Sequence, residues 1–479
     1  MRADLDQGLQ SPLPGTPAIG CKVLQRGFRV GAQVRAGAPA RPFLGLPKRR
    51  ANCRSEVESS IVAKTAKRML SGGMDSDILI RAINKAIRGG AIAAPPEDAL
   101  GEDVSYVRTQ TNVGIEPAVF DAYVADLKAD ADMAAFDGTF ANVPHGGGVS
   151  VSLASIARVL LSRAIATKDV AGTVDRFVSF VANNEATAMA TAVMAVSGVK
   201  VPAPIKLGPD VSLIPLSALP PSPQRGTALG QSRLTPFNPR FPIPSALTTS
   251  FVYRPVFYRP KNPQPPEEMG AHIPTSSAQS LLGEAFDLLS VLSIYPSFRM
   301  FWVQPDDWLM SAGMNSGWQY SSEDQLGPEV GVQTKEAEAL AAAYFSLDPR
   351  KRSKMLRIPL DRLGRAGREQ DLADRAIDLG IALESLLLHD IDHGELSFRL
   401  SLRGAWLLGS DDTERLKIQT SLKKLYDLRS RAVHSGFVER NANTQNTISR
   451  ATEICRGLIQ KLIALKCNID WQRVVVGGC

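Results

Sequence analysis

The sequence contains no long apolar run, few cysteines and no recognisable nucleotide-binding loop. Its longest apolar stretch, "ATAMATAVMAVSGV" at residues 186–199, is shorter than the roughly 20 residues that a membrane-spanning helix requires, so no membrane contact is expected. The five cysteines lack C-x-x-C spacing, which argues against a disulfide scaffold or a zinc ribbon and favours a cytoplasmic location. The glycine-rich stretch at 137–150 has no P-loop or G-x-G-x-x-G motif and is predicted to be a plain loop, so no cofactor is expected.

Positive charge is concentrated near the N-terminus. Residues 1–54 contain ten Lys and Arg residues against two Asp residues, which accounts for the whole formal net charge of +7 and leaves residues 55–479 nearly neutral. The stretch is rich in Pro, Gly and Arg and has no helical or strand period. It predicts a disordered extension over residues 1–68, without function of its own; attraction of RNA to this tail is the less favoured alternative.

Two regions of different composition follow. Residues 69–200 are predicted to form a helical N-terminal domain: a helix begins at a cap on Asp75 or Ser76 and ends at Gly89-Gly90, and further helices are expected over 117–135 and 151–166.

Residues 201–332 are predicted to be a Pro-rich linker with an irregular α+β segment. The stretch 246–260 carries the β-branched and aromatic residues of an edge strand or hairpin, and 278–292 has the pattern of a helix. An aromatic cluster follows, for which a core role is favoured over a ligand-binding platform. Its members are Phe298, Phe301, Trp302, Trp308, Trp318 and Tyr320.

The last third of the chain has the pattern of a helical bundle. Five helices are expected, with a basic stretch from 350 to 368 after the first and a short tail at 469–479. The fourth is predicted to begin at a cap on Asp412 or Thr413 and to end at Ser435-Gly436. The expected helices span 334–347, 371–388, 394–409, 412–436 and 444–465. The whole chain is therefore predicted to be mostly α, with a β-containing middle segment.

Four stretches of this bundle carry a family resemblance. In order they are "DRAIDLGIALESLL", "ELSFRLSLRGAWLLG", "LKKLYDLRSRAVHSG" and a closing helix. Residues 333–468 thereby resemble the Apea-like branch of the HEPN superfamily, whose members are helical bundles that commonly dimerise and of which many are metal-independent endoribonucleases. The family motif, an arginine separated from a histidine by four to six residues, falls on Arg429 and His434, with "SRAV" between them. Ser430 departs from it, because Asn, Asp or His often follows the arginine.

The resemblance implies RNA rather than DNA as a partner, a homodimer formed through the bundle, and no metal. By analogy with toxin or antiviral effectors, the N-terminal region would regulate the nuclease. The alternative is a non-catalytic dimerisation or nucleotide/RNA-binding module, which Ser430 and the near-neutral charge of residues 55–479 favour.

The motif residues suit cleavage of RNA without metal. His434 can take the 2′-hydroxyl proton or protonate the leaving 5′-oxygen, and the helix C-terminus favours the acid role. Arg429 can hold two phosphate oxygens, and Arg431 can assist, although an ion pair with Asp427 is its favoured use. Five residues rotate a helix by roughly 140°, so either the helix ends between Arg429 and His434 or two subunits share the site.

Two further features surround the motif. Glu384, on a mostly apolar helix, needs a cationic partner such as Arg403 or Arg429, and a structural salt bridge that orients Arg429 is favoured. His389 and His393 stand four apart, as metal ligands can, but Gly394 follows at once, so a helix end is favoured over a metal site.

Overall fold

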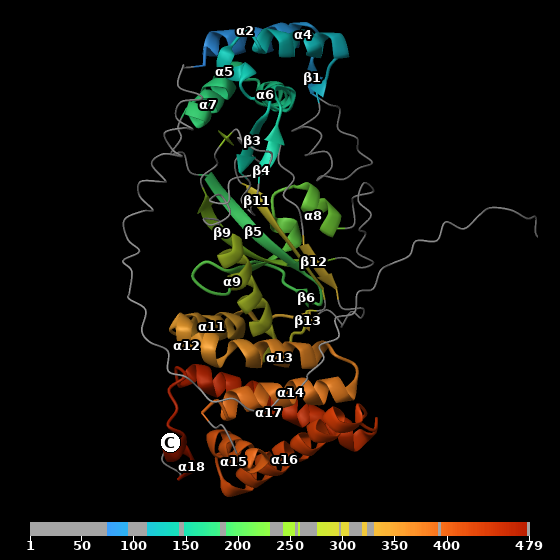
Figure 1. The fold of residues 1–479 in the computed structure, drawn as a ribbon, viewed down its shortest axis with the longest axis vertical. Coiled ribbons are helices and arrows are strands. Elements are labelled where there is room, and N and C mark those ends of the chain that lie inside the picture. The colour runs from blue at the N-terminus through green and yellow to red at the C-terminus, as the bar shows by residue number, and fades with distance from the viewer. Residues whose placement is uncertain are drawn as a thin grey trace, which may run out of the picture. The chain divides into compact units, whose positions relative to one another are not determined.

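The computed structural model describes residues 74–93, 113–142, 148–182, 188–229, 243–253, 257–258, 275–296, 298–305, 319–322, 330–390 and 394–476. All of them belong to one unit, Val57–Cys479. This part is mostly helical, with an antiparallel sheet in the middle of the chain and a helical bundle at its C-terminal end, as the sequence predicted (Figure 1). The basic extension, residues 1–68, lies outside the described residues. None of the described helices is long and apolar enough to span a membrane.

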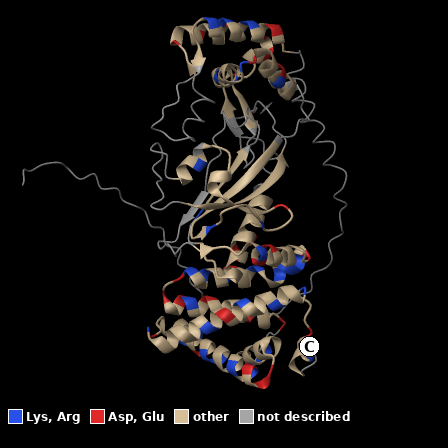
Figure 2. Ribbon diagram, turned by 180° about the vertical axis from the view of Figure 1, so that it is seen from behind, with Lys and Arg blue, Asp and Glu red and all other residues tan. Residues whose placement is uncertain are grey.

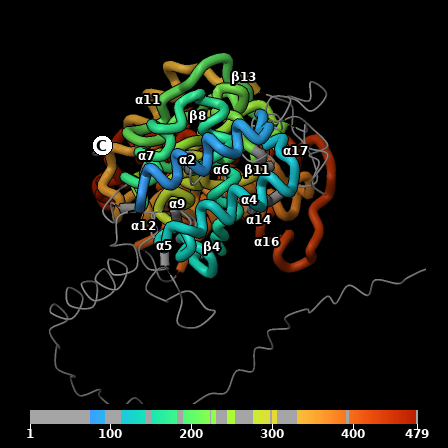
Figure 3. Tube along the Cα trace, turned by 90° about the horizontal axis from the view of Figure 1, so that it is seen from above, coloured from blue at the N-terminus to red at the C-terminus, as the bar shows by residue number. Residues whose placement is uncertain are grey.

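Helices with short strands form the first described region. Asp75 caps α2 by accepting hydrogen bonds from the backbone of Asp77 and Ile78, and the helix ends at Gly89 and Gly90, as expected. Helix α2 packs against α4, beside which it lies, and against α6 and α7 (Figure 3). These helices span Ser76–Arg88 (α2), Pro117–Leu127 (α4), Ala131–Ala134 (α5), Leu153–Thr167 (α6) and Val170–Ala182 (α7).

Short strands complete this region. Strands β1 (Ile92–Ala93) and β2 (Val113–Gly114) pair with each other, and β3 (Thr139–Asn142) pairs with both β4 (Gly148–Val151) and β10 (Phe257–Tyr258). The prediction of a plain loop over 137–150 was therefore wrong at both of its ends, because four-residue strands that form through pairing with each other and with β10 leave little trace in the sequence pattern.

A six-stranded antiparallel sheet occupies the middle of the chain. Its order is β12-β11-β5-β9-β8-β7. The strands are β5 (Ala188–Val196), β7 (Ile205–Lys206), β8 (Ser212–Pro215), β9 (Ser245–Tyr253), β11 (Phe298–Pro305) and β12 (Gln319–Ser322). The apolar stretch at 186–199 supplies β5, so the boundary expected near residue 200 falls inside the sheet. Strand β9 lies between β5 and β8. It is an interior strand, and the edge-strand prediction was wrong because the first half of the strand is buried on both faces of the sheet.

The sheet has a core on each face. On one face, Met194 and Leu282 of α9 (Thr275–Leu288) belong to the main core. On the other face, Val193 and Trp302 pack with α8 (Pro223–Ala228) and the 3-10 turn η1 (Leu216–Ala218). Trp302 is fully buried and Phe301 nearly so, which confirms the core role for these two aromatics. The side chains of Phe298, Trp308, Trp318 and Tyr320 lie outside the described part.

The C-terminal bundle contains more helices than the sequence predicted. The basic stretch 350–368 forms two of them, and part of the predicted tail forms another. The bundle helices are α11 (Thr334–Phe345), α12 (Pro349–Met355), α13 (Arg357–Arg368), α14 (Leu372–Leu387), α15 (Leu396–Leu408), α16 (Asp412–Ser435), α17 (Ala442–Ala464) and α18 (Trp471–Val475). Helix α14 contacts α13, α15, α16 and α17, and nine of its residues are buried. Acidic and basic residues are interspersed over the bundle helices (Figure 2).

Candidate functional site

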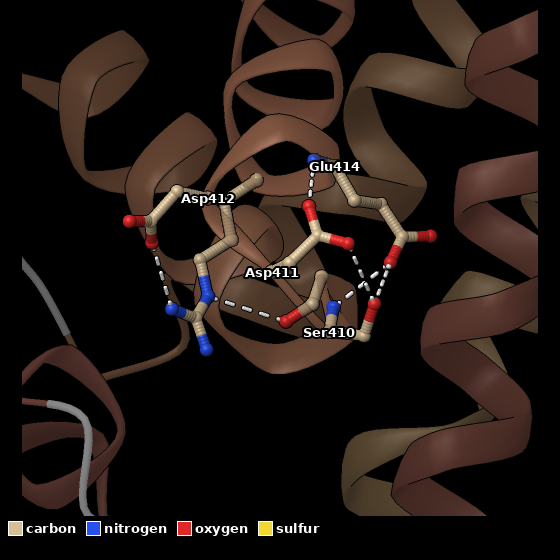
Figure 4. Close-up of polar contacts among 6 residues, drawn as sticks. Ser410, Asp411, Asp412 and Glu414 are labelled. Carbon is tan, nitrogen blue, oxygen red and sulfur yellow. Dashed lines mark hydrogen bonds and ion pairs between the residues drawn. The ribbon is translucent and has the colours of Figure 1, made fainter.

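Helix α16 carries the motif residues, and its own residues fix both of its ends. Asp411, not Asp412 or Thr413, is the N-cap: its Oδ1 accepts a hydrogen bond of 2.8 Å from the backbone N–H of Glu414. The Ser410 hydroxyl and backbone N–H in turn donate to Oε2 of Glu414 (Figure 4). The helix ends at Gly436, whose φ of 66° is the left-handed conformation that glycine adopts without strain.

Arg429 lies beside the buried face of α16 and reaches across to α14. Its Nη2 is 3.2 Å from Oε2 of Glu384, and both side chains are only about a quarter exposed, 27% and 25%. Its guanidinium carbon lies 5.8 Å from the centre of the Tyr426 ring. The predicted ion pair between Glu384 and Arg429 is confirmed, and it joins α14 to α16.

A glycine makes room for the stem of Arg429. A Cβ atom on Gly380 would lie 2.7 Å from Cγ of Arg429, closer than real Cβ contacts allow. Gly380 stands one turn before Glu384 on the same face of α14, so the backbone of α14 and the arginine stem are in direct contact. Sequence reasoning missed this residue, although an isolated glycine inside the apolar run "AIDLGIALES" indicates a close approach.

The pair lies in a partly desolvated setting. Burial raises the pKa of the Glu384 carboxyl, and the neighbouring Arg429 guanidinium acts against that rise. Removing water disfavours the charged carboxylate, whereas the adjacent cation favours it. Arg429 therefore favours the ionised form of Glu384, and Glu384 is the charge partner of Arg429.

His434 lies on the opposite side of α16. The buried residues of this helix are Ile418, Leu422, Leu425, Leu428 and Ala432. His434 follows Ala432 by two positions, about 200° around the helix, and is exposed. The helix continues to Ser435, so it does not end between Arg429 and His434, and the two side chains diverge by roughly 140°. One chain does not bring them together. A helix end between Arg429 and His434 is therefore excluded, and a site shared between two subunits stays a prediction.

The supporting residues have separate environments. Ser430 is half-buried and Arg431 is exposed. The predicted ion pair of Arg431 with Asp427 was wrong: within the described residues, no salt bridge joins them at 4.0 Å or less. Two exposed side chains in water gain little from pairing, since such a pair contributes only about 0.3–0.5 kcal/mol.

Arg403 belongs to a different contact. Its Nη1 donates to the Asp390 carboxylate at 2.5 Å and to the Leu387 carbonyl at 2.6 Å, and its guanidinium carbon lies 4.6 Å from the Trp471 ring centre. The hydrogen bond from Arg403 to its carboxylate lowers the pKa of Asp390. Arg403 thus binds the C-terminal end of α14. The partner of Glu384 is Arg429, so the alternative that named Arg403 was wrong.

The structure describes no metal-binding cluster around the histidines that stand four residues apart. His389 is exposed, with its ring centroid 6.3 Å from that of Trp471, and His393 lies outside the described residues. Within the part of the chain that the structure describes, no group of three or more His, Cys, Asp or Glu residues could hold a metal ion.

Comparison with family models, curated proteins and solved structures gives no match for this chain. The resemblance of residues 333–468 to the HEPN superfamily therefore depends on the residues quoted for it. What the structure defines is a helical bundle in which Glu384 pairs with Arg429 and an exposed His434 lies in the last turn of the same helix.

Proposed function

We propose that residues 333–468 form an Apea-like HEPN domain and that two copies of it form a metal-independent endoribonuclease. The observation that supports this is the contrast between two residues of α16. Arg429 is held in place by Glu384 and Gly380, whereas His434, five residues later, is exposed. The two side chains diverge within one chain, so the active centre requires a second chain.

Two chains also supply the two proton-transfer groups that the reaction needs. One His434 removes the proton from the 2′-hydroxyl, the 2′-oxygen attacks phosphorus, and the bond to the 5′-oxygen breaks. The second His434 protonates that leaving oxygen. The products are a 2′,3′-cyclic phosphate and a 5′-hydroxyl. The outer guanidinium edge of Arg429 stabilises the negative charge on the phosphorane, while its Nη2 stays paired with Glu384.

The surface beside His434 suits a contact with a second copy. Val433 and Phe437 flank the histidine and are 53% and 68% exposed. Large apolar side chains that cluster on a surface mark contact sites, and a two-fold axis would bring the same patch from each chain together. The proposal includes a homodimer through this end of the bundle.

We extend the proposal to regulation and location. The regions before residue 333 would restrain the nuclease, as in toxin or antiviral effectors. The free thiols of Cys455 and Cys467, both in the bundle, suit the reducing cytoplasm.

A second function is supported by a different observation. Arg429 packs on Gly380 and pairs with Glu384, which are uses that a structural arginine would have. In that case the bundle is a non-catalytic dimerisation or RNA-binding module.

The test is incubation of the purified full chain with labelled tRNA and single-stranded RNA in EDTA. Wild type is compared with His434→Ala and with His389→Ala, an exposed histidine outside the motif. We expect cleavage to cyclic phosphate ends by wild type and by His389→Ala, and a loss of at least 100-fold in His434→Ala. Equal rates in all three proteins would refute the catalytic role of His434.

Sedimentation of the same proteins tests the alternative. A wild type that leaves RNA intact, together with an Arg429→Met variant that converts the dimer to monomers, would identify the non-catalytic module.

A further inference from the structure

Tyr295 lies where the middle of the chain meets the bundle. It follows the 3-10 turn η3 (Leu289–Leu292), which contacts α13 and α17. Its ring lies against the backbone of Gly367 in α13: a Cβ atom on Gly367 would be 2.1 Å from the ring carbon Cδ1. Arg375 of α14 and Arg456 of α17 are both close enough to act electrostatically on the Tyr295 hydroxyl. Three helices therefore contribute to the surroundings of one tyrosine.

Neither arginine has an anionic partner in the part of the chain that the structure describes. Both are half-buried, and the Nε atom of each is buried without a hydrogen-bond partner. Among the described residues, neither makes an ion pair with a carboxylate within 4.0 Å. Glu369 acts on Arg375 only from a distance, and its Oε1 accepts hydrogen bonds from the backbone of Gln370 and Asp371.

Other partly buried arginines of the bundle are paired. Arg352 donates to Glu284 at 2.7 Å, and Arg362 donates to Asp378 at 2.7 Å. Burial lowers the pKa of Arg375, as expected for a cation that is desolvated without a counter-charge. A desolvated guanidinium group is costly unless an anion lies beside it.

We propose that Arg375, Arg456 and the Tyr295 hydroxyl bind the phosphate group of a small phosphorylated ligand. Guanidinium groups donate parallel hydrogen bonds to two oxygens of a phosphate, and two of them balance its double negative charge. The tyrosine hydroxyl supplies a further donor. A ligand held there would join η3 to α13, α14 and α17.

This site is separate from the proposed nuclease centre. Arg375 and Glu384 are nine residues apart on α14, which places them on opposite sides of the helix. Glu384 faces α16, whereas Arg375 lies near Tyr295 and α17. The proposal therefore holds whether or not the bundle cleaves RNA.

Isothermal titration of the full chain tests the proposal, with inorganic phosphate and AMP as separate probes. Wild type is compared with Arg375→Gln, Arg456→Gln and Tyr295→Phe, and Arg399→Gln is the matched control because Arg399 is an exposed arginine of α15. We expect saturable binding by wild type and the control, at least tenfold weaker binding in each of the other arginine variants, and a smaller loss in Tyr295→Phe. Tighter binding of AMP than of phosphate would identify a phosphate ester as the ligand, and equal binding would identify free phosphate.

Thermal unfolding provides a second readout. Saturating probe should raise the unfolding temperature of wild type and of Arg399→Gln but not of Arg375→Gln, and circular dichroism of each variant establishes that it is folded. Absence of binding to wild type, or equal affinity in folded Arg375→Gln and wild type, would overturn the proposal.

Discussion

The Glu384–Arg429 pair should behave as a coupled unit in a double-mutant cycle. The perturbations are Glu384→Leu, Arg429→Met and both together. Methionine keeps the unbranched stem that packs on Gly380, so Arg429→Met removes the charge and leaves the packing. Leucine suits the apolar surroundings of residue 384 in α14.

The size of the effect follows from burial and distance. The two charges are 3.2 Å apart and about three-quarters buried, so each single change leaves an uncompensated charge in a partly desolvated place. Breaking a fully buried pair costs about 3–5 kcal/mol, and with the remaining exposure we expect about 1.5–3 kcal/mol for each single variant. The double variant removes both charges and should unfold within about 1 kcal/mol of wild type, so the coupling energy is at least about 2 kcal/mol.

Urea unfolding of the four proteins, followed by circular dichroism, measures this coupling. The pH dependence gives a second measurement. The folded-state pKa of Glu384 is raised by burial, and it rises further without Arg429. A carboxyl with a raised folded-state pKa destabilises the protein as pH increases, so Arg429→Met should regain stability relative to wild type on acidification towards pH 5. Additive single changes, with a double variant as unstable as their sum, would refute the reasoning.

Three more perturbations test local features of the fold by the same unfolding assay. Gly380→Ala should lower the free energy of unfolding by about 1–2 kcal/mol, because its Cβ would overlap the Arg429 stem. Gly283→Ala in α9, where a Cβ would meet nothing within 4 Å, should raise it by about 0.5–1 kcal/mol. The reverse order would contradict the close approach of Arg429 to Gly380. Gly436→Ala should cost about 1 kcal/mol through its φ of 66°, and an unchanged midpoint would exclude the strained C-cap. Burial, reinforced by a nearby carboxylate, raises the pKa of Asp287 to about 6. Asp287→Asn should therefore stabilise the protein by about 2 kcal/mol at pH 7.5 and by little at pH 4. An effect independent of pH would disprove the raised pKa.

Local sequence patterns predicted the helices of the bundle and their ends well. The boundaries of α14, α15, α16 and α17 fall within two residues of the expected ones. Capping and helical periodicity are properties of consecutive residues, so they can be read before the fold is known. The same patterns failed for α12 and α13, where frequent Lys and Arg concealed the apolar face that Leu360 and Leu363 bury.

The candidate site was predicted in part. Glu384 was expected to need an arginine, because a carboxylate on an apolar helix requires a counter-charge. The sequence offered Arg403 and Arg429 as partners and favoured Arg429, and the packing of α14 against α16 confirmed that preference. The unpaired arginines around Tyr295 come from distant segments, and no spacing in the sequence relates them.

By itself, the sequence determined the helical class, the apolar faces, the ends of the main bundle helices to within two residues and the position of the Arg-His motif at the end of a long helix. These depend on interactions between residues within one or two helical turns. The tertiary structure decided which strand is interior, which arginine pairs with Glu384, and that His434 lies away from Arg429. Such features depend on contacts between residues far apart in the chain, whose free energy is set by packing and desolvation and not by local spacing.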